Sequence, residues 1–183
     1  MREFNKIFGI GISRTGTSSL TVALAHLGIA VIHWPAAMAD FSRFRGATDI
    51  TVACRFRELD QIFPDSLFIY TERDVESWLP SVSAHYATFA NSPTPPDPAQ
   101  AFRLEAEIRI YGKLKPTASD FPTAYRRHQK QVLEYFHSRT DRLLRMNLGH
   151  DDGWPQLCNF LCVPVPEITF PHLNKRRAIT TPG

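Results

Sequence analysis

The chain of 183 residues has no long hydrophobic run, and this absence excludes whole classes of protein. No stretch approaches the roughly 18 consecutive apolar residues of a membrane-spanning helix. Residues 1–6 lead directly into a strand-like segment, without the apolar stretch and small-residue cleavage site of a secretory signal. We therefore expect a cytoplasmic protein without membrane contact, folded as one domain over residues 1–183.

Neither sign of charge is in large excess. Lys and Arg number 21 against 18 Asp and Glu, which gives a formal net charge of +3. This balance is too small to indicate nucleic-acid binding, but it suits a small anionic ligand. The composition, 43% apolar and 21% charged, is that of an ordinary globular domain rather than a disordered or fibrous chain.

Cysteine is also scarce. The chain contains three cysteines: Cys54 stands alone, and Cys158 and Cys162 are four residues apart. A structural metal site takes about four ligands, and no His pair or second cysteine pair completes one here. We therefore expect buried free thiols and no metal ion.

The first 33 residues have the pattern of a strand, a loop, a helix and a second strand. An apolar run at 6–12 predicts a buried parallel strand, and a second apolar run follows at 29–32. Between them, Leu20, Ala23, Leu24 and Leu27 share one face of a helix that Gly28 would end. This arrangement is a βαβ unit, and such units are right-handed.

Strands and helices continue to alternate along the rest of the chain. Further strands are expected at 50–53, 67–70 and 143–146, and helices at 56–62, after Asp74, at 99–114, at 121–138 and at 154–161, with a proline-rich loop at 92–98. The pattern predicts a three-layer α/β fold with a central, mostly parallel sheet of about four to five strands flanked by helices. Residues 85–120 would form a helical cap or insert.

The loop after the first strand has the composition of a phosphate-binding loop. Gly11, four residues, then Gly16, Thr17 and Ser18 nearly reproduce the pattern of P-loop nucleotide hydrolases, with Thr17 in place of the lysine. Backbone amides of the loop and of the following helix would hold an anion, and Arg14 would supply the cation. The alternative is a simple turn with a good helix cap. The missing lysine disfavours a kinase or an ATPase.

These residues carry a resemblance to a known family. Residues 13–20, Ser-Arg-Thr-Gly-Thr-Ser-Ser-Leu, resemble the 5′-phosphosulfate loop of sulfotransferases that use 3′-phosphoadenosine 5′-phosphosulfate (PAPS). Arg73 and Ser81, eight residues apart after a strand, resemble the family's 3′-phosphate signature. The segment from Trp154 to Asn174 resembles the ending of a short subgroup of sulfotransferase-like proteins. The resemblance spans residues 6–174.

The resemblance implies a function and assigns residues to it. The protein would transfer a sulfonyl group from PAPS to a hydroxyl or amine and release 3′-phosphoadenosine 5′-phosphate (PAP), without a metal. Donor-binding roles fall on Ser13, Arg14, Thr15, Gly16, Thr17, Ser18, Ser19, Arg73 and Ser81. Arg14 would also stabilise the negative charge that builds on the bridging oxygen during transfer. Many relatives have lysine at the position of Arg14. Lys175-Arg176-Arg177 is the only substitute for a basic segment that many relatives carry near the C-terminus.

The general base is open at this stage. His33 would end the second strand, Asp49 would precede the third, and His85 lies one helical turn beyond Ser81. The resemblance favours Asp49, which matches an aspartate in related short sequences.

Two other functions and the partners also stay open. The protein could be a catalytically silent PAP-binding protein, or an atypical P-loop kinase. The acceptor, a small molecule or a carbohydrate, would lie over residues 85–120, where Tyr86, Phe89, Phe102 and Tyr111 could line it. No nucleic-acid partner is expected, and a homodimer is compatible with the sequence.

Overall fold

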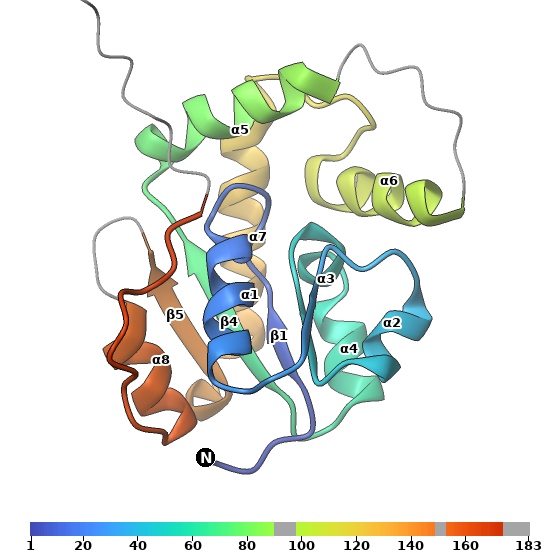
Figure 1. The fold of residues 1–183 in the computed structure, drawn as a ribbon. Helices are drawn as coiled ribbons and strands as arrows, with labels where there is room; N and C mark the ends of the chain where they lie inside the picture. The colour runs from blue at the N-terminus through green and yellow to red at the C-terminus, as the bar shows by residue number, and fades with distance from the viewer. Residues whose placement is uncertain (90–97, 149–152, 174–183) are drawn as a thin grey trace, which may run out of the picture.

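The computed structural model describes residues 1–89, 98–148 and 153–173. Its centre is a five-stranded sheet in which every neighbouring pair is parallel. The strands are β1 (Ile7–Gly9), β2 (Val31–His33), β3 (Gly46–Thr48), β4 (Leu67–Glu72) and β5 (Leu143–Asn147), in the spatial order β2-β3-β1-β4-β5. All carboxyl ends therefore meet at one edge of the sheet, the upper edge in Figure 1.

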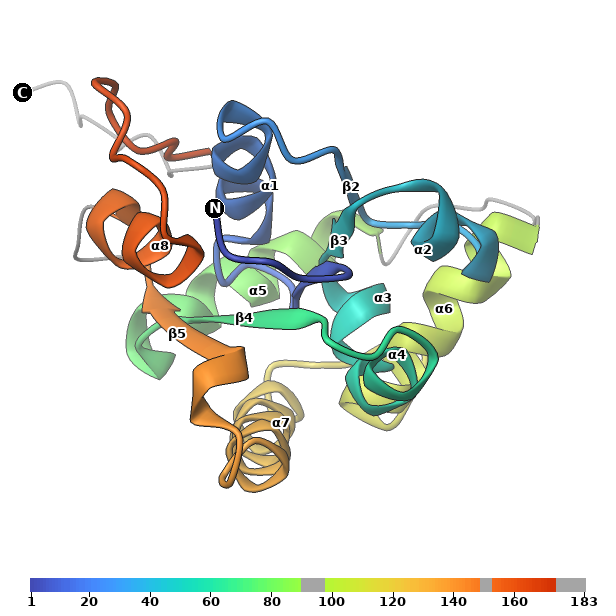
Figure 2. The same ribbon diagram turned by 90° about the horizontal axis from the view of Figure 1, so that it is seen from below.

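Helices cover both faces of this sheet. They are α1 (Thr17–His26), α2 (Met38–Arg43), α3 (Ile50–Ala53), α4 (Phe56–Ile62), α5 (Val75–Phe89), α6 (Pro98–Tyr111), α7 (Phe121–Tyr135), the 3₁₀ helix η1 (Thr140–Arg142) and α8 (Gly153–Leu161). Figure 2 shows α1 and α8 on one side of the sheet and α4 and α7 on the other. The expected three-layer α/β fold is confirmed.

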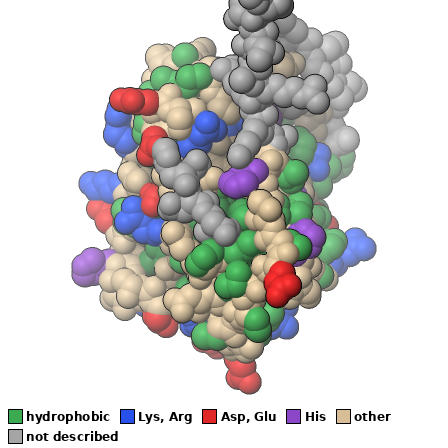
Figure 3. Space-filling view, turned by 60° about the vertical axis from the view of Figure 1, so that its left-hand side comes forward, with side chains coloured by type: hydrophobic (Ala, Val, Ile, Leu, Met, Phe, Trp, Pro, Cys, Tyr) green, Lys and Arg blue, Asp and Glu red, His purple; other side chains and the backbone are tan. Residues whose placement is uncertain are grey.

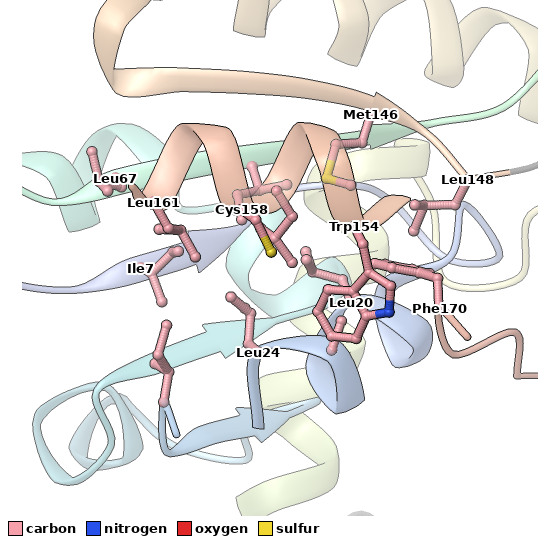
Figure 4. Packing of buried hydrophobic residues seen from close by; sticks show 14 of the residues in the cluster. Ile7, Leu20, Leu24, Leu67, Met146, Leu148, Trp154, Cys158, Leu161 and Phe170 are labelled. Carbon is pink, nitrogen blue, oxygen red and sulfur yellow. The ribbon is translucent and has the colours of Figure 1, made fainter. Parts of the chain in front are cut away.

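Alternation along the strands explains the two layers of core. Ile7 of β1 and Ile69 of β4 point to the α1 and α8 side, where they pack in the cluster of Figure 4. Phe8 and Phe68, the residues next to them, point to the α4 and α7 side. Because successive side chains of a strand face opposite ways, a strand covered on both faces is apolar throughout.

A third cluster of buried side chains lies at the carboxyl edge of the sheet. It joins Trp78 and Val82 of α5 to Ala106 and Ile110 of α6 and to Phe121 of α7. In Figure 1, α5 and α6 extend over the carboxyl ends of the strands. These two helices occupy the part of the chain in which we expected a cap.

The strand expected at 50–53 is wrong, because these residues form α3. The strand of this region is β3, which begins four residues earlier, and it pairs with both β1 and β2. Its residues are small: a side chain on Gly46 would collide with Ile7, so the tight pairing requires glycine. Asp49 then begins α3 by accepting a hydrogen bond from the Ile50 amide (2.6 Å). Asp49 therefore follows the third strand instead of preceding it.

Most other elements lie within a few residues of their expected positions, with β2 beginning later, at Val31. The short α2 was not anticipated. Of the proline-rich loop expected at 92–98, residues 92–97 lie outside the described residues, and Pro98 is the first residue of α6. Of the three cysteines, Cys158 is buried, Cys54 is partly buried and Cys162 is exposed, so the expectation of buried thiols fails at Cys162.

Three properties of the described residues concern possible partners: the distribution of surface charge, the hydropathy of the helices and the grouping of metal-binding side chains. On the face drawn in Figure 3, acidic and basic side chains are interspersed. Among the described residues, no helix has the length and hydropathy needed to cross a membrane. The same residues contain no group of three or more His, Cys, Asp or Glu side chains placed to hold a metal ion.

Candidate functional site

Three residues at the carboxyl edge of the sheet have strained backbones, as do Asp65 and Cys162 elsewhere in the chain. Arg14, Trp34 and Asp49 follow β1, β2 and β3, and all have positive φ values, of 70°, 55° and 96°. Such conformations cost non-glycine residues about 1–3 kcal/mol each and are concentrated at functional sites. The strain therefore marks this edge as the place to look for a ligand site.

The loop between β1 and α1 is held from several sides. Trp78 of α5 donates its indole N–H to the Ser13 carbonyl (2.9 Å), and His128 of α7 donates from Nε2 to the Ile10 carbonyl (2.8 Å). Burial lowers the pKa of His128 to about 4, so this ring is neutral at pH 7. Thr15 bonds Thr71 of β4 through their hydroxyls (2.9 Å). The loop is therefore fixed in shape before any ligand arrives.

The same loop presents backbone amides at the start of α1. Gly16, with φ of 105°, stands at the N-cap position and offers no side chain to cap the helix. The first amide in the helix with a backbone acceptor is that of Leu20, which bonds the Gly16 carbonyl (3.0 Å). The amides of Thr17, Ser18 and Ser19 have no such acceptor in the described part of the chain. A helix N-terminus of this kind is an anion-binding position.

The hydroxyl groups of Thr15, Ser18 and Ser19 form hydrogen bonds within the protein. Thr15 donates to the Ile12 carbonyl (2.8 Å), and Ser18 bonds Nε2 of His33 (3.1 Å). Ser19 accepts a hydrogen bond from the Leu173 amide (2.9 Å). The predicted role of these hydroxyls in donor binding stays a prediction, and the backbone amides of Thr17, Ser18 and Ser19 are the groups that can bind an anion without breaking these contacts.

Two arginines converge on one face of α5. Arg14 donates from Nε to Ser81 Oγ (3.1 Å), and Arg73 donates from Nε to Ser77 Oγ (3.0 Å). Residues four apart on a helix lie one above the other, about 6 Å apart. The two guanidinium groups therefore lie on successive turns of the same helix. Arg73 and Ser81, expected to hold the 3′-phosphate together, therefore lie on the same face of α5, and their joint role stays a prediction.

Arg73 keeps its positive charge without a carboxylate partner. Its neighbour Glu72 pairs instead with Arg145 (2.9 Å), and Arg73 forms no ion pair with any described residue. Its backbone is fixed by the Tyr125 hydroxyl, which accepts from the Arg73 amide (3.0 Å) and donates to the Arg73 carbonyl (2.7 Å). Arg73 is thus a positioned cation beside the loop that holds Arg14.

His33 and Asp49, both expected as bases, lie in direct contact. His33 Nε2 is 3.0 Å from Asp49 Oδ2, and its Nδ1 bonds the Thr48 hydroxyl (2.9 Å). Because Ser18 also bonds Nε2, His33 connects the first turn of α1 to Asp49. The Asp49 side chain is 15% exposed, so it can reach a ligand from this position.

His85, the third candidate base, belongs to the same neighbourhood. Burial lowers its pKa, the positive charge of Arg14 lowers it further, and the charge of Asp49 opposes both effects. The carboxyl edge therefore collects Arg14, Asp49 and His85 from three separate elements. This proximity follows from the parallel sheet, in which loops after different strands meet.

The C-terminal segment returns to the same region. Phe170 packs edge-on against Trp154 of α8 (5.1 Å between ring centroids), and a side chain on Gly153 would collide with the Phe170 ring and with Leu148. The Leu173 amide then reaches α1 at Ser19. The basic residues Lys175-Arg176-Arg177, expected to substitute for a longer basic segment, lie outside the described residues.

A comparison with known families agrees with this geometry. A family model described as a sulfotransferase domain matches residues 6–45 and 40–179. The chain belongs to this sulfotransferase family. The motifs around Arg14 and Arg73, from which the resemblance was identified, are both inside the matched ranges.

Two proteins similar to this sulfotransferase chain were found by the other comparisons. "Ava biosynthesis cluster protein M" of Aspergillus versicolor is 28% identical over 221 residues, covering 92% of this chain and 80% of the relative. Among solved structures, mouse sulfotransferase SULT7A1 complexed with PAP is 15% identical, with a TM-score of 0.49. The match covers 91% of this chain but spans 61% of the length of the mouse protein.

Several residues at the carboxyl edge of the sheet in this sulfotransferase were not anticipated from the sequence. Ser77 is four residues after Arg73 and four before Ser81, so helical spacing could have identified it. The contacts of Trp78 with Ser13 and of Tyr125 with Arg73 join elements far apart in the chain. No local sequence pattern carries that information.

Proposed function

We propose that the protein transfers a sulfonyl group from PAPS to a hydroxyl or amine of an acceptor and releases PAP. The observation that carries this proposal is the pair of guanidinium groups of Arg14 and Arg73 on successive turns of α5, beside the free amides of α1. PAP has phosphates at both its 5′ and 3′ positions, so two neighbouring anion sites suit it. Family membership supports the same donor.

The residues present fit such a donor. Ser13, Thr15, Gly16, Thr17, Ser18 and Ser19 build the loop and helix start whose backbone amides would hold the 5′-phosphate. A side chain on Gly11 would collide with Thr71 and Thr15, so this loop can close only around glycine. Arg73, assisted by Ser77 and with Ser81 beside it, would hold the 3′-phosphate.

When bound, PAPS supplies a sulfonyl group joined to its 5′-phosphate through an anhydride oxygen. Arg14 would stabilise the negative charge that grows on this oxygen as the S–O bond breaks. Arginine remains protonated, so it acts by charge and hydrogen bonding and does not donate a proton. The contacts of Trp78, His128 and Thr71 keep the loop in place during this change, which lowers the cost of reorganisation.

Asp49 is our proposed base. It would accept the proton that the acceptor loses, while His33 holds the Asp49 carboxylate in position from Oδ2. His33 itself has partners at both ring nitrogens, so we assign it to positioning and not to proton transfer. No step in this mechanism calls for a metal ion, and the acceptor would be a small molecule or a carbohydrate.

The test is a thermal-shift comparison of PAP, adenosine 5′-phosphate and ATP–Mg²⁺ on the wild type, Arg73→Ala and a matched control. We expect PAP to stabilise the wild type most, and Arg73→Ala to lose most of the margin of PAP over adenosine 5′-phosphate. The control, Arg126→Ala, removes an exposed arginine of α7 and should retain that margin.

Three results would point elsewhere. Equal shifts with all three nucleotides would refute the 3′-phosphate assignment. Stabilisation by ATP–Mg²⁺ and not by PAP would indicate a kinase. PAP binding with no transfer to any acceptor of a broad panel, and with the same affinity in Asp49→Asn, would indicate a catalytically silent binding protein.

A further inference from the structure

Two buried aromatic rings connect the backbones of the two proposed phosphate sites. Trp78 of α5 is 0% exposed and Tyr125 of α7 is 3% exposed, and their ring centroids lie 4.8 Å apart. The first turns of α7 lie against α5 at this point (Figure 1). Trp78 donates its indole N–H to the Ser13 carbonyl (2.9 Å), whereas Tyr125 bonds Arg73, the residue after β4. The packed pair of rings therefore joins the loop of Arg14 to the segment of Arg73.

The Tyr125 hydroxyl holds both backbone groups of Arg73. It accepts a hydrogen bond from the amide (3.0 Å) and donates one to the carbonyl (2.7 Å). These two groups flank the Cα atom from which the guanidinium side chain extends, so the contact fixes the direction in which that side chain leaves the backbone. A phenylalanine at this position could make neither bond, and both part-buried backbone groups would lose their partner.

The same face of α7 holds the ends of the two central strands. Three residues after Tyr125, His128 donates to the carbonyl of Ile10, which follows β1 (2.8 Å). Four residues after Tyr125, Gln129 donates from Nε2 to Glu72 Oε2 at the end of β4 (3.2 Å). Residues three and four apart share one face of a helix. Helix α7 is therefore a common support for the loop after β1 and for the residue after β4.

The spacing of the two sites matters only to a ligand that occupies both. PAP carries phosphates at its 5′ and 3′ positions, whereas adenosine 5′-phosphate carries one. Tyr125 holds the backbone of Arg73 and Ser77 holds its guanidinium group (3.0 Å), so the second site is in place before the ligand arrives. Such preorganisation strengthens binding because fewer groups must be ordered on association. Only the nucleotide with a 3′-phosphate gains from it.

We propose that Tyr125 determines the preference of the protein for a nucleotide that is phosphorylated at both its 5′ and 3′ positions. Tyr125 is a positioning residue: it acts through the backbone of Arg73, and its ring is kept in place by Trp78. This proposal rests on the proposed function, because it takes Arg73 as the group that binds the 3′-phosphate. It assigns to α7 a role in selecting the donor.

The test compares the affinities of PAP and adenosine 5′-phosphate by calorimetric titration of the full chain. The wild type should prefer PAP. Tyr125→Phe should lower PAP affinity about tenfold and leave adenosine 5′-phosphate affinity within about twofold, because the loop that holds the 5′-phosphate keeps its own contacts. In the Arg73→Ala background, Tyr125→Phe should change PAP affinity by less than about twofold, because the side chain that it positions is already absent.

A matched control is available on the same helix. Tyr135, the last residue of α7, donates its hydroxyl hydrogen bond to Asp60 Oδ2 (2.9 Å). It lies about 15 Å along the helix from Tyr125. Tyr135→Phe also removes one tyrosine hydroxyl with its bond, so it reports the effect of general destabilisation. It should leave the affinities of both nucleotides within about twofold.

A second measurement uses the wild type without nucleotide. The Arg73 amide donates to a buried hydroxyl, so its hydrogen exchange, followed by NMR, should be about a hundredfold or more slower than that of an unstructured peptide. Exchange at the rate of an exposed loop amide would overturn the proposal whatever the variants do.

The outcomes separate this proposal from the proposed function. A wild type that binds both nucleotides equally refutes the 3′-phosphate assignment and this proposal with it. A wild type that prefers PAP, with a Tyr125→Phe variant that keeps the preference, overturns the role of Tyr125 alone. The role is also overturned if Tyr135→Phe loses the preference to the same extent, if Tyr125→Phe acts equally in the Arg73→Ala background, or if Tyr125→Phe fails to fold, since each result would make the hydroxyl a general support of the fold.

Discussion

The partly buried carboxyl of Glu107 on α6, which has no hydrogen bond or ion pair to a described residue, makes a prediction about stability. Burial raises the pKa of its carboxyl from the ordinary value to about 7, so ionisation at higher pH works against folding. One pKa unit corresponds to about 1.4 kcal/mol, but the side chain is only partly buried and water screens the effect. We therefore expect the charge to cost about 1–2 kcal/mol at pH 8.

The sign follows from linkage. A carboxyl whose pKa is raised in the folded state contributes stability at low pH that is lost as the pH rises through about 7. Glu107→Gln keeps the shape and removes the charge, so at pH 8 it should melt about 2–8 °C above the wild type. At pH 5 the two should melt within about 1 °C of each other, because the wild-type carboxyl is then mostly protonated.

The assay is thermal unfolding followed by circular dichroism at several pH values. Tyr86 and Tyr111 have pKa values raised above the ordinary value, chiefly by burial, and remain neutral throughout this range. The Glu134→Gln variant reports any general effect of removing one negative charge. Equal melting temperatures of the wild type and Glu107→Gln at pH 8 would refute the conclusion that this carboxylate is unpaired.

Three further substitutions test the loop and the proposed base. Gly11→Ala should lower the free energy of unfolding by about 1–3 kcal/mol in urea titrations, because the methyl group of the new alanine would collide with Thr71. Trp78→Phe leaves the Ser13 carbonyl without its donor, so stability should fall by about 1–3 kcal/mol and calorimetry should show weaker PAP binding. Asp49→Asn should lower the transfer rate about a hundredfold or more, while PAP affinity stays within about twofold; an unchanged rate would exclude Asp49 as the base.

The fold could be predicted from the sequence where hydrophobic periodicity is strong. The run at 6–12 and the spacing of Leu20 and Leu24 identified β1 and α1, because both bury apolar faces. Strand β3 was missed because Gly46 and Ala47 have little tendency to form strands by themselves. They pair between β1 and β2 because a small residue permits the close approach, and the more β-branched segment 50–53 turns into a helix after Asp49.

The candidate site could be predicted only in part. Residue types and spacing indicated Arg14 and Arg73, and in the structure both side chains bond serines of α5. The serine that each arginine bonds depends on where α5 begins relative to β4, and the sequence alone did not indicate that Arg73 bonds Ser77 or that Arg14 bonds Ser81. Glu107 was not identified, because its lack of a partner is a tertiary property.

A crystal structure of the protein with PAP is the most direct measurement of the central claim. We predict that the amides of residues 17–19 bind the 5′-phosphate, and that the Arg73 guanidinium lies within hydrogen-bonding distance of the 3′-phosphate. A structure with PAP bound elsewhere, or with its 3′-phosphate turned away from Arg73, would contradict the account.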